Sequence, residues 1–305
     1  MQTLLEAIRP TTFIRSEKLS GYLGIDLTIA TETFQHTGSF KFRAAYNVAL
    51  NVENEHLIAA SSGNFGQALA YSAKLLGKKC HVVMPETSAK VKVDAVSNYG
   101  AVADLIDVNS IGREERVAQL MEEFPDAYQA SAYDDPLVID GNSTLGDEIA
   151  DYKEDFDFVV VPVGGAGLIS GISKALCGKD DRAKLIGAEP LIANDAARSL
   201  RLGKIVRNEQ EPQTIADGAR TVSVGNYNWE IIREGVQAIV EVSEANIKQA
   251  LCLYFQLANL KVEPTGALSL AAMLENHDSF GGKKVCVVVS GGNVDPAIFV
   301  QILAG

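Results

Sequence analysis

Short runs of apolar residues alternate with helix-length amphipathic segments through most of this chain, and this alternation restricts the fold more than any other feature. Residues 57–60, 80–84 and 102–106 are typical of buried strands, and segments with helical spacing follow them. The clearest strand pattern lies at residues 285–289, Val-Cys-Val-Val-Val. Strands that alternate with helices indicate a parallel sheet covered on both faces. The sequence therefore predicts an α/β fold with parallel-rich sheets and helices on both faces.

Composition and charge limit the compartment and the partners. The chain has 305 residues, 47% of them hydrophobic, which is enough for a large core divided between two lobes. A net charge of -12 and a pI near 4.9 argue against nucleic-acid and anionic-membrane partners. Residues 1–10 lack the continuous apolar region of a signal peptide, and no apolar run reaches membrane-spanning length. We expect a soluble, cytoplasmic protein.

The cysteines and histidines predict neither a disulfide framework nor a zinc site. Cys80, Cys177, Cys252 and Cys286 are far apart, and most have apolar neighbours. We therefore expect buried free thiols in a reducing compartment. The four histidines show no ligand spacing and are interpreted as structural or surface residues.

One lysine lies at the centre of the segment Thr-Gly-Ser-Phe-Lys-Phe-Arg, residues 37–43. The next residues have helical spacing, so Ser39 is predicted to be the N-cap and Lys41 to lie in the first turn. The helix dipole disfavours a cation there, and Phe40 and Phe42 would exclude water from the amine. Both effects favour the neutral, nucleophilic amine that Schiff-base chemistry requires. The alternative is an ordinary solvated surface lysine.

A glycine-rich loop, Gly164-Gly165-Ala166-Gly167, follows the strand-like run at residues 156–163 and precedes a helix. Consecutive backbone N–H groups at a helix N-terminus can bind a phosphate without a basic side chain. A dinucleotide site is an alternative, but it requires its glycines in the first strand–helix unit and an acidic residue about 20 residues later. A plain tight turn is the other alternative.

Two further loops with small polar residues follow predicted strands, where ligands of parallel sheets bind. Residues 61–66, Ser-Ser-Gly-Asn-Phe-Gly, offer hydroxyl, amide and backbone donors for a phenolic oxygen or a substrate carboxylate. Residues 290–293, Ser-Gly-Gly-Asn, offer a hydroxyl for a ring nitrogen. For each loop the alternative is an ordinary turn or helix cap.

These four segments occur in the order seen in pyridoxal 5′-phosphate enzymes of fold type II, and the chain most resembles the threonine dehydratase and serine racemase family. Further matching segments lie at residues 132–136, 213–218 and 263–265, so the resemblance covers nearly the whole chain. It implies a two-lobed molecule in which residues 53–132 form the small domain and residues 1–52 and 133–305 form the large, cofactor-binding domain. The implied cofactor is pyridoxal 5′-phosphate, and we also expect a homodimer.

The resemblance assigns cofactor roles position by position. Lys41 would form the Schiff base, with Phe40 packed against the pyridine ring. Asn64 would bond the 3′-oxygen of the cofactor, and Ser290 would meet the ring nitrogen. The phosphate would be bound by the backbone of Gly164, Gly165, Ala166, Gly167 and Leu168.

The resemblance also implies a substrate site and a metal site. The substrate carboxylate would be bound by Ser61, Ser62, Gly63 and Phe65. Glu189, the carbonyl of Ala193 and Asp195 match a divalent-cation site of the racemase branch, whose hard oxygen ligands suit magnesium or calcium. An acidic helix start is the alternative for these residues.

The chain departs from the family pattern at several positions. Phe65 replaces a histidine, Ala166 a glycine, Ala44 a glycine and Ala30 a lysine. Phosphate binding survives the change at residue 166 if the φ angle of Ala166 is negative. Phe65 removes a polar group near the substrate.

The implied activity is an ammonia-lyase reaction on a small amino acid. L-Threonine, L-serine or a related β-hydroxy amino acid would lose water and yield a 2-oxo acid and ammonia, with Lys41 as the base at Cα. A racemase is the first alternative, because Ser62 matches the acid/base residue that racemases use on the opposite face. A β-replacement synthase is a weaker alternative, and a non-catalytic binding protein is the weakest.

Overall fold

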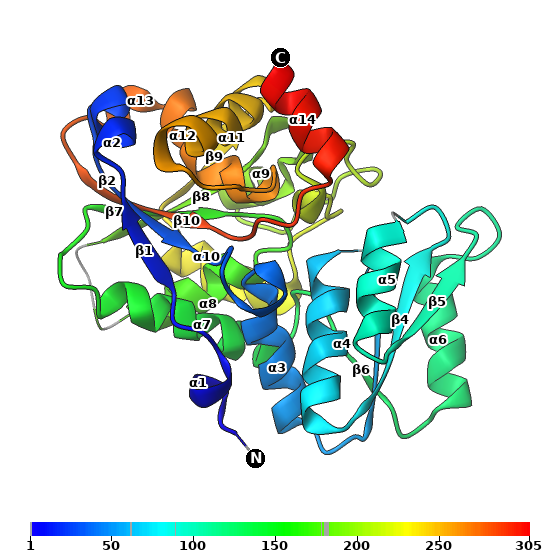
Figure 1. Cartoon of the computed structure of the whole chain (residues 1–305). Coiled ribbons are helices and arrows are strands. Elements are labelled where there is room, and N and C mark those ends of the chain that lie inside the picture. The colour runs from blue at the N-terminus through cyan, green and yellow to red at the C-terminus, as the bar shows by residue number, and fades with distance from the viewer. Residues whose placement is uncertain (1, 62, 89, 178, 180–182) are drawn as a thin grey trace.

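A computed structural model of the chain describes residues 2–61, 63–88, 90–177, 179 and 183–305, and its strands form two separate sheets (Figure 1). In spatial order, the six-stranded sheet consists of β1 (Thr12–Arg15), β2 (Asp26–Thr31), β10 (Lys284–Val289), β7 (Phe158–Pro162), β8 (Lys184–Pro190) and β9 (Ala238–Val242). The four-stranded sheet consists of β5 (Val102–Ile106), β4 (Lys79–Pro85), β3 (His56–Ala60) and β6 (Tyr128–Gln129). β1 pairs antiparallel with β2, and the other neighbours pair parallel.

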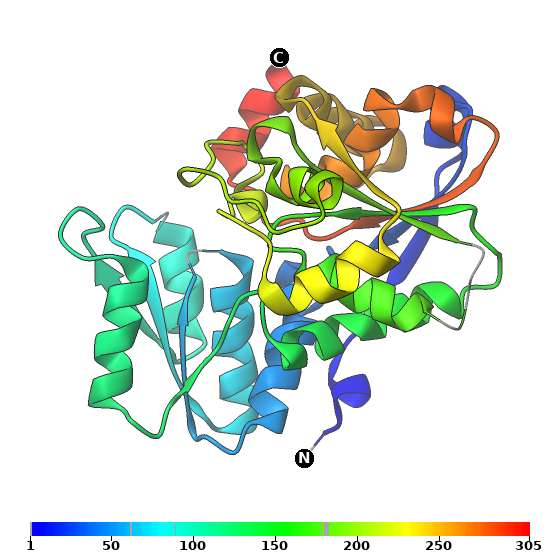
Figure 2. The same ribbon diagram turned by 180° about the vertical axis from the view of Figure 1, so that it is seen from behind.

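Helices cover both faces of the six-stranded sheet. One face packs against α2 (Glu17–Leu23), α11 (Glu244–Ala258), α12 (Leu268–Glu275), α13 (His277–Phe280) and α14 (Pro296–Ala304). The other face packs against α7 (Pro136–Ala150), α8 (Gly167–Leu176), α9 (Asp195–Leu202) and α10 (Asn226–Gly235). Figure 2 shows α10, in yellow, lying beside the green α8 on this second face.

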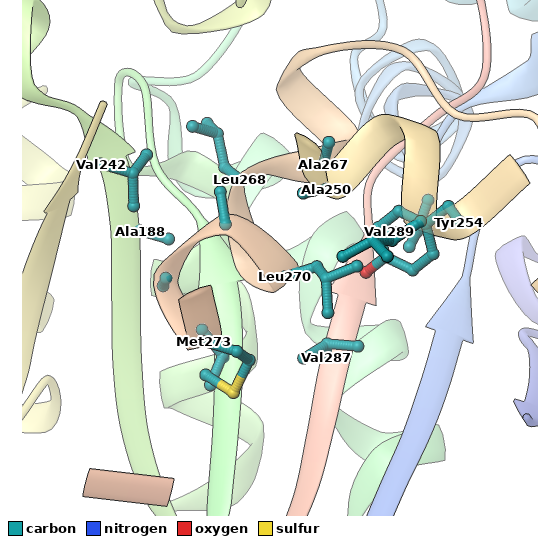
Figure 3. Packing of buried hydrophobic residues seen from close by; sticks show 14 of the residues in the cluster. Ala188, Val242, Ala250, Tyr254, Ala267, Leu268, Leu270, Met273, Val287 and Val289 are labelled. Carbon is teal, nitrogen blue, oxygen red and sulfur yellow. The ribbon is translucent and has the colours of Figure 1, made fainter. Parts of the chain in front are cut away.

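The pleat of β10 divides its side chains between the two cores. Val287 and Val289 face the core of α11 and α12, where Figure 3 shows them with Leu270 and Tyr254. Cys286 and Val288 face the opposite core, beneath α7 and α8. Both sets are fully buried, which explains why this strand is apolar throughout rather than alternating.

The four-stranded sheet has its own cores. α4 (Asn64–Leu76) and α5 (Lys90–Asn98) pack on one face, and α6 (Arg113–Glu123) packs on the other. α3 (Lys41–Asn51) joins the two halves, because it packs against α4 on one side and α7 on the other. The contact with α7 is very close, since a Cβ atom built on Gly141 would lie 2.8 Å from the Cα atom of Ala44. Figure 1 shows α3 between the two sheets.

The α/β fold with parallel-rich sheets and helices on both faces is confirmed, and the predicted strands agree with β3, β4, β5, β7 and β10 to within two residues. The sequence does not predict α2, α10, α14 or the strands β1, β6 and β9. We propose that the domains divide at 53–132 against 1–52 and 133–305. The placement of the four strands β3 to β6 within residues 53–132 supports this division.

Two other expectations are tested by the described residues. The four cysteines are free, as predicted, but Cys177 is exposed because it ends α8 at the surface, whereas Cys80 and Cys286 are buried. The described residues contain no helix long and apolar enough to cross a membrane. α1 (Leu4–Ala7) is a short helix near the start of the chain.

Candidate active site

Lys41 is the first residue of α3, and its amine is enclosed. Its Nζ atom donates a hydrogen bond to the carbonyl of Ala132 at 2.6 Å and lies 4.9 Å from the ring centre of Phe40 and 5.7 Å from that of Phe65. Burial lowers the pKa of Lys41 to about 8, while the carboxyl of Glu263 acts in the opposite direction. An amine with this pKa is partly neutral at physiological pH and can act as a nucleophile or base.

Two details of the lysine segment differ from the expectation. Ser39 does not cap the helix with its side chain, because its buried hydroxyl has no hydrogen-bond partner among the described residues, and the cap position falls on Phe40. Phe42 does not cover the amine. Its ring packs against His36 and Tyr46 at centroid distances of 4.8 and 5.5 Å, because residue 42 points to the opposite side of the first turn. Phe65, far away in sequence, contacts the amine in its place.

The glycine-rich loop connects β7 to α8 and presents free backbone donors. In the described part of the chain, the N–H groups of residues 164–168 donate to no acceptor. The loop packs tightly on its other side, where a Cβ atom on Gly164 would lie 2.7 Å from the carbonyl oxygen of Gly218. Its carbonyls are engaged, since Asn228 Nδ2 donates to Gly165 O at 2.8 Å and Asn142 Nδ2 to Gly167 O at 3.0 Å. The arrangement is therefore a cradle for an anion.

Ala166 has a φ of +72°, so the condition of a negative φ stated from the sequence does not hold. A left-handed conformation costs an alanine about 1–2 kcal/mol, which explains why glycine is the usual residue there. The loop keeps its shape because Ala166 is buried and its carbonyl accepts from Ser170 N at 2.9 Å.

Replacing Gly165 by alanine is expected to weaken phosphate binding. The new Cβ atom would lie 2.2 Å from Cδ2 of Tyr133, so either the ring or the loop must move. Such overpacking typically costs about 1–3 kcal/mol, which predicts a rise in the dissociation constant of pyridoxal phosphate of roughly tenfold. A cofactor titration followed by absorbance measures it. Gly21→Ala is the matched control, because a Cβ atom on Gly21 meets no atom within 4 Å, and equal affinities of the two variants would contradict the prediction.

The lysine loop and the other two polar loops meet beside Lys41. The carbonyl of Ser290 accepts a hydrogen bond from Phe40 N at 2.9 Å, and Ser39 forms an isolated bridge with Gly291. Asn64, the first residue of α4, accepts a hydrogen bond at Oδ1 from Asn293 Nδ2 at 2.8 Å. Among the described residues, the buried hydroxyls of Thr37 and Ser39 have no hydrogen-bond partner. These unpaired groups and free amides fit a polar ligand such as a phosphorylated pyridine ring.

Of the residues expected to bind a substrate carboxylate, Ser61 and Gly63 lie between β3 and α4, and Phe65 is the second residue of α4. Ser61 Oγ accepts from Gly66 N at 3.0 Å and from Gly63 N at 3.4 Å, so it also helps to cap α4. Phe65 is buried in the core of the four-stranded sheet and touches the Lys41 amine with its ring. Ser62 lies outside the described residues.

Glu189 and Asp195 lie close together at the end of β8 and the start of α9. Both are buried, and the Glu189 carboxylate accepts from Ala197 N at 2.7 Å and from Ala196 N at 3.3 Å. Asp195 Oδ2 has no partner among the described residues. Burial raises the pKa of Asp195 to about 6, and burial together with the charge of Asp195 raises that of Glu189 well above its usual value. Two buried carboxyl groups, one of them with an unpaired oxygen, suit the binding of a cation. Among the described residues, however, no group of three His, Cys, Asp or Glu side chains is arranged to hold a metal ion.

Several residues at this site were not found from the sequence. Both carboxyl oxygens of Glu263 accept a hydrogen bond from Asn64 Nδ2, and Asn293 donates to the oxygen of the same amide. Tyr133 packs on the glycine-rich loop. Glu263 was noted only as part of a matching segment. No spacing signal connects it with Asn64, because the two residues are 199 positions apart.

The fold and the site define a class of protein. Residues 4–291 match the family described as pyridoxal-phosphate dependent enzyme, and the chain belongs to that family. Within it, the chain is 38% identical over 306 residues to the L-threo-3-hydroxyaspartate ammonia-lyase of Saccharomyces cerevisiae, covering 98% of this chain and 93% of the relative. It is 36% identical over 303 residues to the serine racemase of Dictyostelium discoideum, covering 97% and 93%.

The structure of the chain is also similar to a solved structure. The T.th. threonine deaminase superposes with a TM-score of 0.90 at 39% identity, covering 96% of this chain and 95% of that chain. The resemblance stated from the sequence is therefore confirmed.

Proposed function

We propose that this protein is a pyridoxal-phosphate-dependent ammonia-lyase that converts a β-hydroxy amino acid into a 2-oxo acid and ammonia. The observation that carries the proposal is the Lys41 amine, enclosed by two aromatic rings where the polar loops meet, with its pKa lowered to about 8. Relatives named as 3-hydroxyaspartate lyase or dehydratase, at 35–38% identity, favour 3-hydroxyaspartate over L-serine and L-threonine as the substrate.

The residues proposed to hold the cofactor follow from their surroundings. The free amides of residues 164–168 bind the phosphate, Asn64 donates to the 3′-oxygen, and Ser290 bonds the ring nitrogen. Lys41 is the attachment point, and Phe40 packs against the ring. When bound, pyridoxal phosphate withdraws the electron pair left by the breaking Cα–H bond.

The chain supplies the proton transfers and the binding of substrate. Lys41 Nζ takes the Cα proton, for which its lowered pKa suits it. Ser61, Ser62, Gly63 and Phe65 hold the substrate carboxylate and thereby orient the Cα–H bond. The β-hydroxyl leaves as water and takes up one proton, which balances the proton removed from Cα. A second water then hydrolyses the resulting enamine to the 2-oxo acid and ammonia.

A panel assay tests this function. Release of 2-oxo acid from L-threo-3-hydroxyaspartate, L-serine and L-threonine should be detectable, with the highest kcat/KM for 3-hydroxyaspartate. No release from any of the three would overturn the proposal. Cysteine formation that depends on sulfide would instead support β-replacement.

Serine racemase activity is the second candidate, favoured by relatives of that name at 35–36% identity. Ser62 is the residue proposed to act on the opposite face of the substrate. Chiral analysis of unreacted serine separates the two activities, because a lyase alone leaves no D-serine.

We also propose that Glu189, the Ala193 carbonyl and Asp195 bind Mg²⁺ or Ca²⁺. The raised pKa values mean that the empty pair binds protons more tightly in the folded state than in the unfolded state. The contribution of the protonated pair to stability is therefore present at low pH, and the part that comes from Asp195 is lost as the pH rises through about 6. A cation binds the ionised pair, so the gain in Tm on adding Mg²⁺ or Ca²⁺ should be larger near pH ~7.5 than near pH ~5.5.

Thermal melts with each cation and with a chelator measure this gain. Glu189→Gln should abolish it, whereas Glu53→Gln on the exposed surface should keep it. A gain that Glu189→Gln retains would contradict the proposed site.

The proposed setting is a cytoplasmic homodimer with a small amino-acid substrate. Exposed apolar side chains such as Phe34, Phe255 and Val300 provide apolar surface for a subunit contact. The charge of -12 disfavours nucleic acid as a partner.

A further inference from the structure

Glu263 lies in the interior of the site with its carboxyl against Asn64. The residue is 4% exposed, and both of its carboxyl oxygens accept from Asn64 Nδ2, at 2.9 and 3.1 Å. Its backbone N–H donates to Gly291 O at 3.1 Å. A Cβ atom on Gly291 would lie 2.5 Å from Glu263 Oε1. The absence of a side chain at Gly291 therefore makes room for the Glu263 carboxyl.

The Asn64 amide is held at both ends. Glu263 accepts at Nδ2, and Asn293 Nδ2 donates to Oδ1 at 2.8 Å while also donating to Thr37 O at 2.7 Å. Rotating the amide by 180° would place its Nδ2 against the Nδ2 donor of Asn293, which Thr37 O holds in place, and this contact would be lost. The second N–H of Asn64 is therefore the group presented to a ligand.

The carboxyl also determines the charge next to Lys41. Burial raises the pKa of Glu263 to about 8, with a further rise from Asp217 and an opposing effect of the Asn64 hydrogen bond, Lys92 and Lys261. Its interaction with Lys41 links the protonation of the two groups. A carboxyl with this pKa is mostly protonated at neutral pH, so the side of the site next to Glu263 carries little charge. This is consistent with an uncharged group, the hydroxyl of Ser290, at the ring nitrogen.

We propose that Glu263 is a positioning residue for the lyase reaction, which directs the Asn64 amide so that an N–H faces the phenolic oxygen of the cofactor. This inference rests on the proposed function and on the proposed role of Asn64. It adds a residue outside the segments proposed to hold the substrate carboxylate and the phosphate, and it places the control of the cofactor's protonation in the contact between Glu263 and Asn64.

The test uses reconstituted holoenzyme and four variants: Glu263→Gln, Asn64→Ala, their combination, and Glu53→Gln as an exposed control. Glu263→Gln nearly preserves the shape of the side chain but brings a donor to the Asn64 amide. It should keep the cofactor on Lys41, detected as a borohydride adduct. The midpoint of its absorbance-versus-pH titration should move by about one unit, since the Asn64 N–H that faces the phenolic oxygen is then no longer held by a carboxyl acceptor. kcat should fall roughly tenfold with KM little changed.

The combined variant decides whether Glu263 acts through Asn64. If it does, the combination should resemble Asn64→Ala alone in both the spectral midpoint and kcat. Effects that multiply, or a Glu263→Gln spectrum identical to that of the wild type, would overturn the proposal. Should Glu263→Gln not fold, Asn293→Ala removes the contact at the other end of the amide and must shift the midpoint in its place.

The outcomes separate this inference from the proposed function. A wild-type protein that binds the cofactor but releases no 2-oxo acid would overturn the lyase proposal, and the spectral midpoints would still decide the role of Glu263.

Discussion

Replacing Lys41 by alanine is expected to lower 2-oxo acid release by about 10⁴-fold or more, because we propose that the same amine attaches the cofactor and removes the Cα proton. The substitution removes an amine enclosed by the rings of Phe40 and Phe65, and the hydrogen bond to Ala132 O is lost with it. The Lys41→Ala protein should still fold, since a buried amine is costly to desolvate. Initial rates, together with mass spectrometry after borohydride reduction, measure both effects.

Lys74→Ala is the matched control for this experiment. Lys74 is exposed near the end of α4, so its removal should leave the rate and the borohydride adduct unchanged. A Lys41→Ala protein that turns over substrate at the wild-type rate, or an adduct on a different lysine, would refute the assignment of the catalytic amine.

Replacing Arg43 by alanine is expected to reduce the free energy of unfolding by about 3–5 kcal/mol, the usual cost of removing one partner of a buried ion pair. The Arg43 side chain is 0% exposed and binds Glu32 at 2.8 Å through Nε and Glu148 at 3.0 Å through Nη2. It also donates to Thr11 Oγ1 at 2.9 Å and Thr144 Oγ1 at 3.0 Å. Without the guanidinium, the buried carboxylate of Glu32 has no counter-charge.

Urea denaturation measures the change, and Arg15→Ala is its control. Arg15 pairs with Asp26 and Glu154, but it is 44% exposed, so its loss should cost about 1 kcal/mol or less. Arg43→Lys should fall between the two, because a lysine retains the charge but not the planar set of donors. Equal losses for Arg43→Ala and Arg15→Ala would show that the buried network does not stabilise the fold.

The sequence is most informative about features that depend on a single local pattern of residues. The apolar run of β10 and the glycines before α8 could be found because buried strands and phosphate loops have strong local patterns. β1 and β9 were missed because they are short edge strands with mixed patterns.

Contacts between distant segments were not predictable in the same way. Phe65, rather than Phe42, covers the Lys41 amine because the packing of α4 against α3 selects the ring. The positive φ of Ala166 depends on the loop's tertiary surroundings, which override the preference of an alanine. The bond between Glu263 and Asn64 joins segments 199 residues apart, and no periodicity in one sequence encodes it.

Helix α3 has a mechanical consequence for the chemistry at its first residue. It packs against α4, which covers the four-stranded sheet, and against α7, which covers the six-stranded sheet, with Ala44 so close to Gly141 that no side chain fits between them. A rotation of one sheet relative to the other would therefore have to move α3 with one of these neighbours and slide it along the other. Lys41, at the first residue of α3, would move with the helix, so the position of its amine depends on how the two sheets are oriented, even though the residue belongs to neither sheet.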